Sequence, residues 1–373
     1  MKLAVLTNDY SPNPRGGGGI IAEQYVRSLQ ARGHEVRVLK CSDVRRRNIL
    51  ARVIFHLRDL FARDEIVREI LEIKPDMLLT HNLTGCGFGT PKAIQRAGIP
   101  WVHMLHDVQL VEPSGQIIQG ESHETLRRLW RYSWSRLRRV ALGKPTAVFS
   151  PTKWLLDFHK SYGFFREIKS TVIPNPIPTT DHASKEGGTS PPLQGQGLLF
   201  VGRLSKDKGL DLLLAAWNEF GSDRPLLHIV GDGELEKDIE SISDPLLVKH
   251  GHLSHDEVLS LMRKCETVTV PSRVWENQPT VILEALSQGC RVIASDVGGI
   301  PETLGNAGRL FPAGNIQALR DALKQTIGRV RTTEEIAAAQ IVIARHRVDD
   351  AADVLEAFLR SNLNTRNFHP SSV

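Results

Sequence analysis

The sequence predicts two doubly wound α/β domains in tandem, and two observations carry this prediction. Apolar strand-like runs alternate with helical stripes through residues 2–107, which is typical of a parallel sheet with helices on both faces. Residues 174–192 then hold five prolines and no apolar periodicity, which indicates a linker, and the alternation restarts at residue 197. We predict a first domain at 1–175, a linker at 176–192, a second domain at 193–345, and a C-terminal helix and tail at 346–373 that packs back on the first domain.

The elements of both domains follow from local patterns. In the helix predicted at 19–33, apolar residues recur at 21, 22, 25, 26 and 29, and Gly33 suits a C-terminal cap. The first half also holds strands at 2–8, 34–41, 76–82 and 99–107 and helices at 64–75 and 89–98. The second half holds strands at 197–204, 225–233, 266–272 and 290–297 and helices at 208–220, 255–265 and 279–289. Ligands bind beyond the carboxyl ends of such strands, so the loops there are candidates for chemistry.

Composition excludes several classes of protein. With 373 residues, 41% apolar and 24% charged, the chain suits a globular protein of two domains. No apolar run approaches the roughly 20 residues of a membrane span, and the N-terminus turns polar too soon for a signal peptide. The four cysteines, Cys41, Cys86, Cys265 and Cys290, are scattered and form no CxxC pair. We therefore expect free thiols and a cytoplasmic location.

The charge is distributed unevenly along the chain. Residues 1–175 hold 27 Lys and Arg against 16 Asp and Glu, although the whole chain has a net charge of only +5. Within this half, the segment 127–139, RRLWRYSWSRLRR, interleaves arginines with Trp and Tyr. Such a pattern suits an anionic membrane surface, here the inner face of the plasma membrane, or an acidic substrate. The alternative is a solvated helix face whose aromatic residues pack inward, and no recognition motif points to nucleic acid.

Four glycines, Gly16 to Gly19, precede the first predicted helix. Glycine lets a backbone approach a ligand closely, and the free amides of a helix start favour an anion. Gly17, Gly19 and Ala22, with Asp43 after the next strand, also match a loose NAD-binding pattern. About nine residues separate the strand end from Gly16, which disfavours NAD because that fingerprint begins at the strand end. We interpret the segment as a ligand-contacting glycine loop, with a plain flexible turn as the alternative.

Arg203 lies at the end of the strand predicted at 197–204, and Lys208 lies at the start of the next helix. Two cations five positions apart on one loop can bind one diphosphate, the arginine through paired hydrogen bonds and the lysine as a point charge. Surface salt bridges are the alternative interpretation. The position at a strand end, followed by Gly209, favours phosphate.

The segment 274–289, VWENQPTVILEALSQG, places Glu276 and Glu284 on either side of a proline. Pro279 suits the first turn of a helix, where its missing N–H costs nothing, so we expect a helix from about 279 to 288 with Gly289 as its terminator. Glu276 then lies in the loop before the helix, at the reacting end of a ligand. Glu284 lies on the second turn and accepts hydrogen bonds farther back. The alternative is two surface glutamates.

Together these motifs resemble the retaining GT-B glycosyltransferases, most closely family 4. The resemblance extends through nearly the whole chain: the glycine loop, His106-Asp107 after a strand, VIPNPI, VGRL with KG, VGDGE, PSRVWEN and EALSQGCRVIASDVGGIPE. It implies the GT-B fold, in which two Rossmann-like domains face a central cleft, with the acceptor on the first domain and the nucleotide-sugar on the second. It also implies retaining transfer of a sugar from a UDP- or GDP-sugar to a hydroxyl of a glycan or lipid-linked acceptor, in cell-surface polysaccharide or glycolipid synthesis.

The resemblance implies catalytic roles for four residues. Arg203 and Lys208 would bind the donor diphosphate, Glu276 would hold the sugar hydroxyls, and His106 would lie near the anomeric carbon. Glu284 would accept the ribose hydroxyls. The remaining donor contacts would come from Gly18, Gly19, Gly231, Leu253, Asn277, Gln278, Thr280 and Val281. In the family, the segment after the first glutamate is usually glycine-rich, whereas here it contains Pro279, which has no N–H. This departure bears on which sugar the site accepts.

The chain contains no Asp-x-Asp triplet, so we expect no divalent metal and no cofactor besides the nucleotide-sugar co-substrate. Two cations and a helix N-terminus would stabilise the leaving diphosphate instead. In the family, retention is usually explained by attack on the face from which the diphosphate leaves. That reaction needs no protein nucleophile.

Three other functions are weighed against this one. A retaining glycosidase needs two carboxyls about 5 Å apart across one bond, whereas Glu276 and Glu284 are expected at opposite ends of a nucleotide-sugar. A catalytically inactive GT-B binding module is disfavoured by the intact Glu276, Arg203 and Lys208. An NAD-dependent dehydrogenase rests only on the loose glycine pattern.

Overall fold

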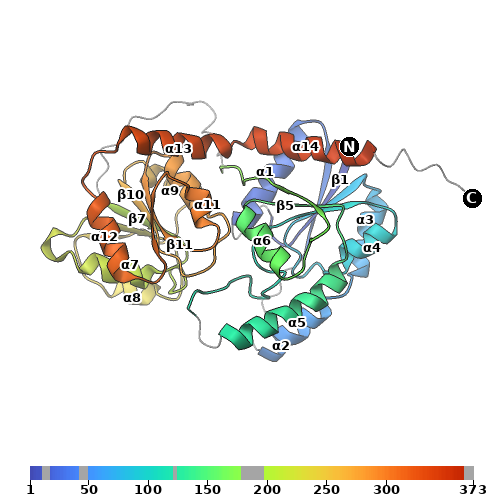
Figure 1. Ribbon diagram of the computed structural model, residues 1–373, viewed down its shortest axis with the longest axis horizontal. Helices are drawn as coiled ribbons and strands as arrows, with labels where there is room; N and C mark the ends of the chain where they lie inside the picture. The colour runs from blue at the N-terminus through green and yellow to red at the C-terminus, as the bar shows by residue number, and fades with distance from the viewer. Residues whose placement is uncertain (11–16, 42–48, 121–123, 178–196, 365–373) are drawn as a thin grey trace, which may run out of the picture. The chain divides into compact units, whose positions relative to one another are not determined.

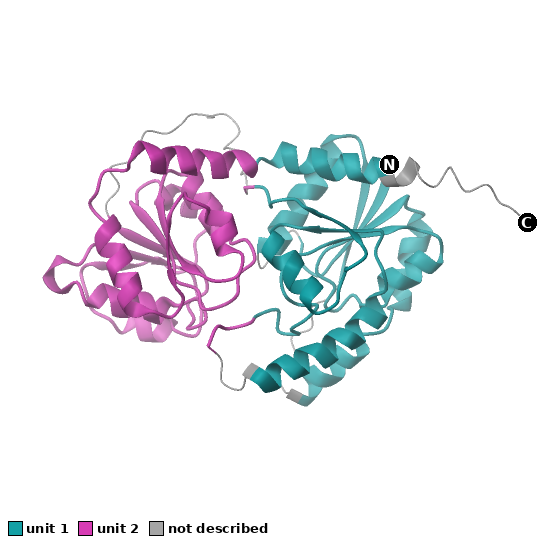
Figure 2. Ribbon diagram, viewed as in Figure 1, with its two compact units in different colours: residues 1–116, 122–176, 347–373 teal, residues 117–121, 177–346 magenta. Residues whose placement is uncertain are grey.

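The computed structural model describes residues 1–10, 17–41, 49–120, 124–177 and 197–364 and divides into two compact units (Figures 1 and 2). Unit 1 comprises Met1–Gln116, Ser122–Pro176 and Arg347–Val373, and unit 2 comprises Ile117–Glu121 and Ile177–His346. The segment 117–121 belongs to unit 2, although the sequence placed it in the first domain, because Ile118 forms a β-bridge with Val274. The predicted linker lies outside the described residues after residue 177.

Unit 1 contains one parallel six-stranded sheet of order β2-β1-β3-β4-β5-β6. Four of its strands are buried throughout or nearly so, as expected for a sheet covered on both faces. The strands are β1 (Lys2–Thr7), β2 (Glu35–Lys40), β3 (Met77–Thr80), β4 (Trp101–Met104), β5 (Ala147–Ser150) and β6 (Lys169–Val172). The helices are α1 (Gly17–Ala31), α2 (Ile49–Arg58), α3 (Asp64–Ile73), α4 (Thr90–Arg96), α5 (Glu124–Leu142), α6 (Lys153–Ser161) and α14 (Val348–Asn364).

Unit 2 contains a second parallel six-stranded sheet, of order β12-β11-β10-β7-β8-β9. Counted from β7, this is the doubly wound order 3-2-1-4-5-6, whose switch point lies between β7 and β10. The strands are β7 (Leu198–Val201), β8 (Leu227–Val230), β9 (Leu247–Lys249), β10 (Thr267–Val270), β11 (Arg291–Asp296) and β12 (Arg309–Pro312). The helices are α7 (Leu210–Asn218), η2 (Gly221–Asp223), α8 (Glu236–Glu240), α9 (His255–Met262), α10 (Thr280–Ser287), α11 (Ile300–Leu304), α12 (Ile316–Thr326) and α13 (Thr333–Arg345).

The C-terminal helix α14 belongs to the core of unit 1. Leu355 and Leu359 are fully buried in the same apolar cluster as Tyr25 and Leu29 of α1. Arg32, just after α1, pairs with Asp353 at 2.8 Å. Helix α14 thus completes the apolar packing of the first sheet.

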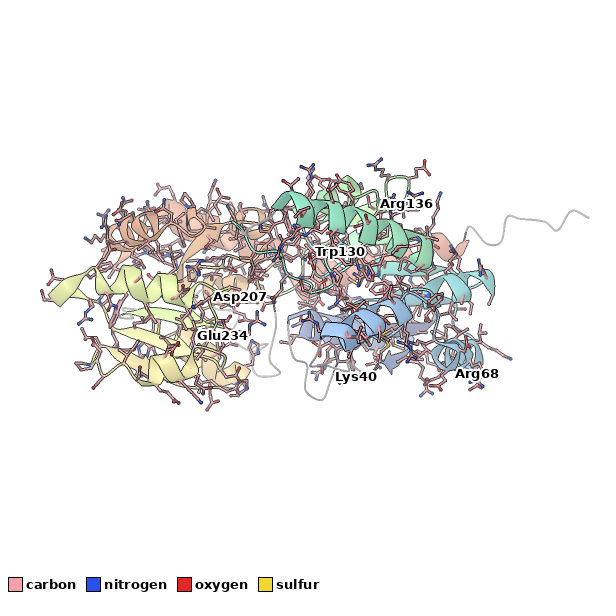
Figure 3. The ribbon with its side chains drawn as sticks, turned by 90° about the horizontal axis from the view of Figure 1, so that it is seen from below. Lys40, Arg68, Trp130, Arg136, Asp207 and Glu234 are labelled. Carbon is pink, nitrogen blue, oxygen red and sulfur yellow. A yellow bond between two sulfur atoms is a disulfide. The ribbon has the colours of Figure 1, made fainter. Side chains whose placement is uncertain are left out.

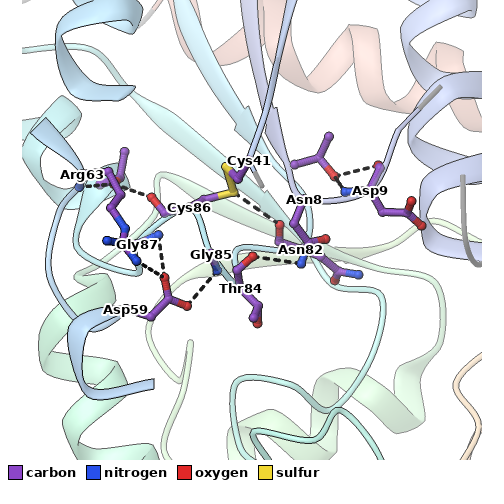
Figure 4. Close-up of a disulfide and its surroundings, with 12 residues drawn as sticks. Asn8, Asp9, Cys41, Asp59, Arg63, Asn82, Thr84, Gly85, Cys86 and Gly87 are labelled. Atoms are coloured by element: carbon purple, nitrogen blue, oxygen red, sulfur yellow. Dashed lines mark hydrogen bonds and ion pairs between the residues drawn. A yellow bond between two sulfur atoms is a disulfide. The ribbon is translucent and has the colours of Figure 1, made fainter. Parts of the chain in front are cut away.

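A disulfide contradicts the prediction of four free thiols. Cys41 and Cys86 are bonded, with Cα atoms 5.2 Å apart, whereas Cys265 and Cys290 are free and buried (Figure 4). The pair is 45 residues apart in sequence, and β1 brings it together by pairing with both β2, which ends before Cys41, and β3, whose following loop carries Cys86. The cysteine argument for a reducing compartment therefore fails.

None of the helices in the described part of the chain has the length and apolar character needed to cross a membrane.

Candidate active site

The two cations of unit 2 lie at the switch point of its sheet. Arg203 and Lys208 follow β7, and Glu276 follows the neighbouring strand β10. Each cation pairs with a carboxylate: the Arg203 guanidinium with Asp207, and the Lys208 ammonium with Glu276 Oε1. The fold thus brings Lys208 and Glu276, 68 positions apart in sequence, into one ion pair, which the sequence did not predict.

The loop that carries Glu276 is fastened to the loop that carries Lys208. Arg273 donates through Nη1 to Asp211 at 3.0 Å and to the carbonyl of Lys206 at 2.9 Å. Its backbone N–H donates to the carbonyl of Asp207, also at 2.9 Å. Sequence analysis did not single out Arg273, and its position inside PSRVWEN was the only available signal. Arg273 is therefore a positioning residue for both loops.

Gly209 allows these loops to touch. Its φ of +74° is in the left-handed region, and a Cβ there would clash with the carbonyl of Pro271, just after β10. Ser272 adds a direct contact, because its hydroxyl donates to Glu276 Oε1 at 3.1 Å. The Glu276 carboxylate thus has two donors, Lys208 and Ser272, and its orientation is fixed before any ligand arrives.

The Asn-Gln-Pro-Thr step is close to its expected geometry. Helix α10 begins at Thr280, with Pro279 as its N-cap at φ −63° and ψ 116°, so the proline precedes the first helical residue rather than occupying it. Gly289 follows the helix at φ +82°. The side chain of Gln278 is buried and bonds His346 at 2.8 Å. Gln278 would thus contact a nucleotide-sugar through its backbone.

Asn277 is buried on the same step, and Thr280 and Val281, the first two residues of α10, are half-buried. Val281 packs against the apolar cluster beneath the helix.

Glu284 lies on the second turn of α10 and is buried, as expected from the helix start. His255, the first residue of α9, approaches its Oε1 at 3.4 Å through Nε2. The hydrogen bond with Glu284 raises the pKa of His255, because the carboxylate favours the protonated imidazole. Glu284 is thus a buried residue and not a surface glutamate. Its histidine partner was not predicted from the sequence.

Gly231 and Leu253 complete the predicted set in unit 2. Gly231 has φ +131°, and a Cβ there would clash with the carbonyl of Gly202, so the loops after β7 and β8 touch at this point. Its N–H donates to Gly251 at 2.8 Å, which places the GHL loop beside it. Leu253 is half-buried against the apolar cluster that contains α10.

In unit 1 the predicted residues lie at the switch point between β1 and β3. Helix α1 begins at Gly17, so Gly18 and Gly19 are in its first turn rather than in a preceding loop. A Cβ on Gly18 would lie 3.4 Å from Asn82 Nδ2 and 3.6 Å from His106 Cγ. Gly16 and Asp43 fall outside the described residues. The absent side chain of Gly18 thus lets α1 approach the loops that follow β3 and β4.

His106 has a histidine partner that sequence analysis missed. Nδ1 of His81 lies 2.7 Å from Nε2 of His106, and the two rings are stacked. Burial lowers the pKa of His106 to about 4 and lowers that of His81 well below its usual value. Both imidazoles are therefore neutral at pH 7, and each ring has one nitrogen that donates and one that accepts. The signal in the sequence was the polar pair at 81–82 directly after a buried strand.

Neighbouring polar groups brace this part of unit 1. Asn8 donates through Nδ2 to Thr84 at 3.0 Å, and Asp59 accepts the amides of Gly85 and Gly87 at 2.9 and 3.0 Å (Figure 4). Asp107 is half-buried beside His106, and loss of solvation raises the pKa of its carboxyl to about 6. No group of three or more His, Cys, Asp or Glu in the described ranges is arranged to hold a metal ion.

Sequence comparison places both units in known families. The profile of glycosyltransferase family 4 matches residues 15–181, and that of glycosyl transferases group 1 matches residues 195–329. An uncharacterized 42.6 kDa protein in the cps region of Klebsiella pneumoniae is 23% identical, with 86% of this chain and 90% of that protein aligned. The alpha-maltose-1-phosphate synthase of Mycolicibacterium smegmatis is 24% identical, with 93% and 94% aligned.

Solved structures share the fold. Sucrose-phosphate synthase from Thermosynechococcus elongatus superposes with a TM-score of 0.69 at 16% identity, covering 98% of this chain and 100% of that one. Anabaena HepE in complex with UDP gives a TM-score of 0.69 at 19% identity, with 97% and 100% covered. The same protein with UDP-glucose gives 0.68 at 20% identity, with the same coverage. The two parallel sheets of this chain are therefore a GT-B architecture.

Proposed function

Because the chain belongs to the glycosyl transferases of group 1 and family 4, we propose that it moves a sugar, with retention of configuration, from a nucleoside-diphosphate-sugar to an acceptor hydroxyl. The observation that carries the proposal is the ion pair of Lys208 with Glu276 at the switch point of unit 2. A cation suited to a diphosphate and a carboxylate suited to sugar hydroxyls meet there, as a nucleotide-sugar requires where its two parts join.

The donor would replace the pairs that now hold these side chains. The diphosphate would replace Asp207 as the partner of Arg203 and Glu276 as the partner of Lys208, because its phosphate oxygens carry more negative charge than one carboxylate does. The freed Glu276 carboxylate would accept hydrogen bonds from the sugar hydroxyls while Ser272 still holds it. Glu284 would accept the ribose hydroxyls in place of His255.

We propose that the acceptor hydroxyl attacks the anomeric carbon on the face from which the diphosphate leaves. The bond between the anomeric carbon and the phosphate oxygen breaks, its electron pair goes to the diphosphate, and a phosphate oxygen takes the acceptor's proton. Arg203, Lys208 and the free amides at the N-terminus of α10 stabilise the charge that develops. In unit 1 we assign donor contacts to Gly18, Gly19 and the neutral His106, which can accept or donate one hydrogen bond to the sugar.

The comparisons support the substrate class. HepE binds UDP and UDP-glucose, which favours a UDP-sugar over a GDP-sugar here. The Klebsiella relative lies in a cps region, and a Schizosaccharomyces pombe relative, 30% identical over 170 residues, is a phosphatidylinositol N-acetylglucosaminyltransferase subunit. We therefore propose a glycan or lipid-linked acceptor in polysaccharide or glycolipid synthesis.

A thermal-shift panel of nucleoside diphosphates and their sugars tests the donor site. At about 100 times its dissociation constant, a true donor stabilises the protein by about 2.7 kcal/mol, which for a unit of this size raises Tm by roughly 5–10 °C. Lys208→Ala should lose most of that shift, because the diphosphate loses its point charge. The matched control Lys237→Ala, on an exposed part of α8, should keep it. Equal shifts in both variants would contradict the assignment of Lys208.

Chelation tests the proposal that no divalent metal takes part. Release of nucleoside diphosphate from the best donor of the panel should proceed at the same rate after dialysis against EDTA, because Arg203, Lys208 and α10 supply the positive charge. Loss of activity with EDTA and its recovery on adding Mg²⁺ or Mn²⁺ would overturn this account of the leaving group.

A further inference from the structure

Exposed apolar side chains of unit 1 gather on two helices. Of sixteen large hydrophobic residues that are exposed in the described chain, eleven lie between residues 50 and 61 or between 126 and 140. Leu50, Phe61, Leu126 and Val140 each expose about two thirds of their area, at 70, 70, 67 and 68%. Scattered exposed apolar residues are ordinary, but a concentration on two elements marks an interaction surface.

On α2 the exposed residues form one stripe. They recur at intervals of three, four and seven, which places them within about 100° of one another around the helix. The members are Leu50, Val53, Ile54 and Leu57, and the exposed Phe61 follows shortly after the end of the helix. Such a stripe normally faces a core, but here it faces outward.

Helix α5 has a similar exposed apolar stripe, and arginines are buried on its opposite side. Leu126, Leu129, Trp130, Leu137 and Val140 share one exposed face about 100° wide. On the opposite side two arginines are buried: Arg131 pairs with Glu112 at 3.0 Å, and Arg138 lies 4.4 Å over the ring of Phe88. The helix therefore buries arginines and exposes leucines. This is the reverse of the pattern expected for a helix face in contact with water.

The two stripes belong to one surface. The rings of His56 on α2 and Trp134 on α5 lie 6.3 Å apart, and Figures 1 and 3 show the two helices side by side. Trp130 and Arg136 are both exposed on α5 (Figure 3).

The charge of this surface has one sign. Six arginines are exposed within 50–61 and 125–142, and the only acidic residue described there, Asp59, is buried. The exposed six are Arg52, Arg58, Arg127, Arg128, Arg136 and Arg139.

We propose that α2 and α5 of unit 1 dock on an anionic lipid surface, with the leucines and Trp130 entering the headgroup region and the arginines contacting lipid phosphates. Parallel apolar stripes flanked by arginine and aromatic residues are the pattern of helices that lie in the plane of a bilayer interface. A second copy of the chain fits less well, because the same patch on both partners would set arginines against arginines. An acceptor held in that membrane would then reach the enzyme by diffusion in two dimensions.

Vesicle flotation tests the proposal with the full chain. The protein should bind vesicles of phosphatidylcholine with phosphatidylglycerol and not vesicles of phosphatidylcholine alone. Raising the salt from about 0.1 to about 1 M shortens the Debye length from about 10 to about 3 Å and should release most of it. Arg128→Gln with Arg136→Gln should weaken binding about thirtyfold, since each arginine near such a surface contributes about fivefold. Lys237→Gln with Arg345→Gln, both exposed in unit 2, is the charge-matched control and should bind normally.

A second double substitution tests the role of the apolar stripe in membrane binding. Leu129→Ser with Leu137→Ser should lower binding by at least about tenfold, whereas Ile341→Ser with Val330→Ser, exposed in unit 2, should not. Both variants should keep the wild-type thermal shift with the nucleotide-sugar, which separates a docking defect from misfolding and from failure of the proposed activity. Absence of binding to anionic vesicles would overturn the proposal. So would a lipid-free dimer that Leu129→Ser with Leu137→Ser converts to a monomer, because it would assign the surface to a second copy.

Discussion

Replacement of Glu276 by glutamine is expected to lower kcat/KM for sugar transfer by about a hundredfold to a thousandfold, the range seen when one transition-state hydrogen-bond partner is removed. The Glu276 carboxylate accepts from Ser272 and pairs with Lys208. Glutamine keeps the shape, but it has no charge for Lys208 and offers a donor where the sugar hydroxyls need an acceptor.

Binding of the nucleoside diphosphate separates this effect from a folding defect. Without its carboxylate partner, Lys208 is free for the diphosphate, so Glu276→Gln should bind UDP as tightly as the wild type or more tightly. Glu236→Gln, on an exposed part of α8, is the matched control and should leave both rate and affinity unchanged. Unchanged turnover in Glu276→Gln would remove Glu276 from the reacting end of the donor. Rates are measured as nucleoside diphosphate release, and affinities by calorimetry.

Local pattern was enough to predict the parallel α/β fold and the elements that carry the site. An apolar run indicates the strand before Arg203. A proline suited to a helix start, followed by apolar residues, indicates the helix after Pro279. These signals act over a few residues. The predicted start of α10 was therefore wrong by only one position, whereas Gly17 and Gly18 were wrongly left outside α1 because their composition favours a loop.

What sequence could not predict depends on contacts between distant segments. The pairing of Cys41 with Cys86 follows from the strand order β2-β1-β3, which no local pattern encodes. His81 reaches His106 for a related reason, since β3 and β4 are neighbours and end at the same edge of the sheet. The inward arginines of α5 are a third case: composition shows Arg138 in a basic helix, but only packing shows that it is buried against Phe88. Function is concentrated at such points, where local preference and the final packing disagree.

Replacement of Gly298 by alanine is expected to lower kcat/KM by about a hundredfold, through displacement of Glu276. Gly298 has φ +63°, and a Cβ there would clash with the carbonyl of Glu276 and lie 2.9 Å from its amide nitrogen. The next residue, Gly299, donates to the same carbonyl at 2.7 Å. The loop after β11 thus supports the backbone of Glu276, and an added methyl group displaces that backbone.

Gly289→Ala is the matched control for this substitution. Gly289 also has a left-handed backbone, at φ +82°, but nothing lies within 4 Å of the position of its Cβ. Both variants bear the conformational cost of a Cβ at positive φ, about 1–2 kcal/mol of unfolding free energy. Only Gly298→Ala moves the catalytic loop, so Gly289→Ala should lose stability and keep its rate. If the two variants lose the same stability and the same activity, the Gly298 loop does not position Glu276, and the carboxylate depends on Ser272 and Lys208 alone.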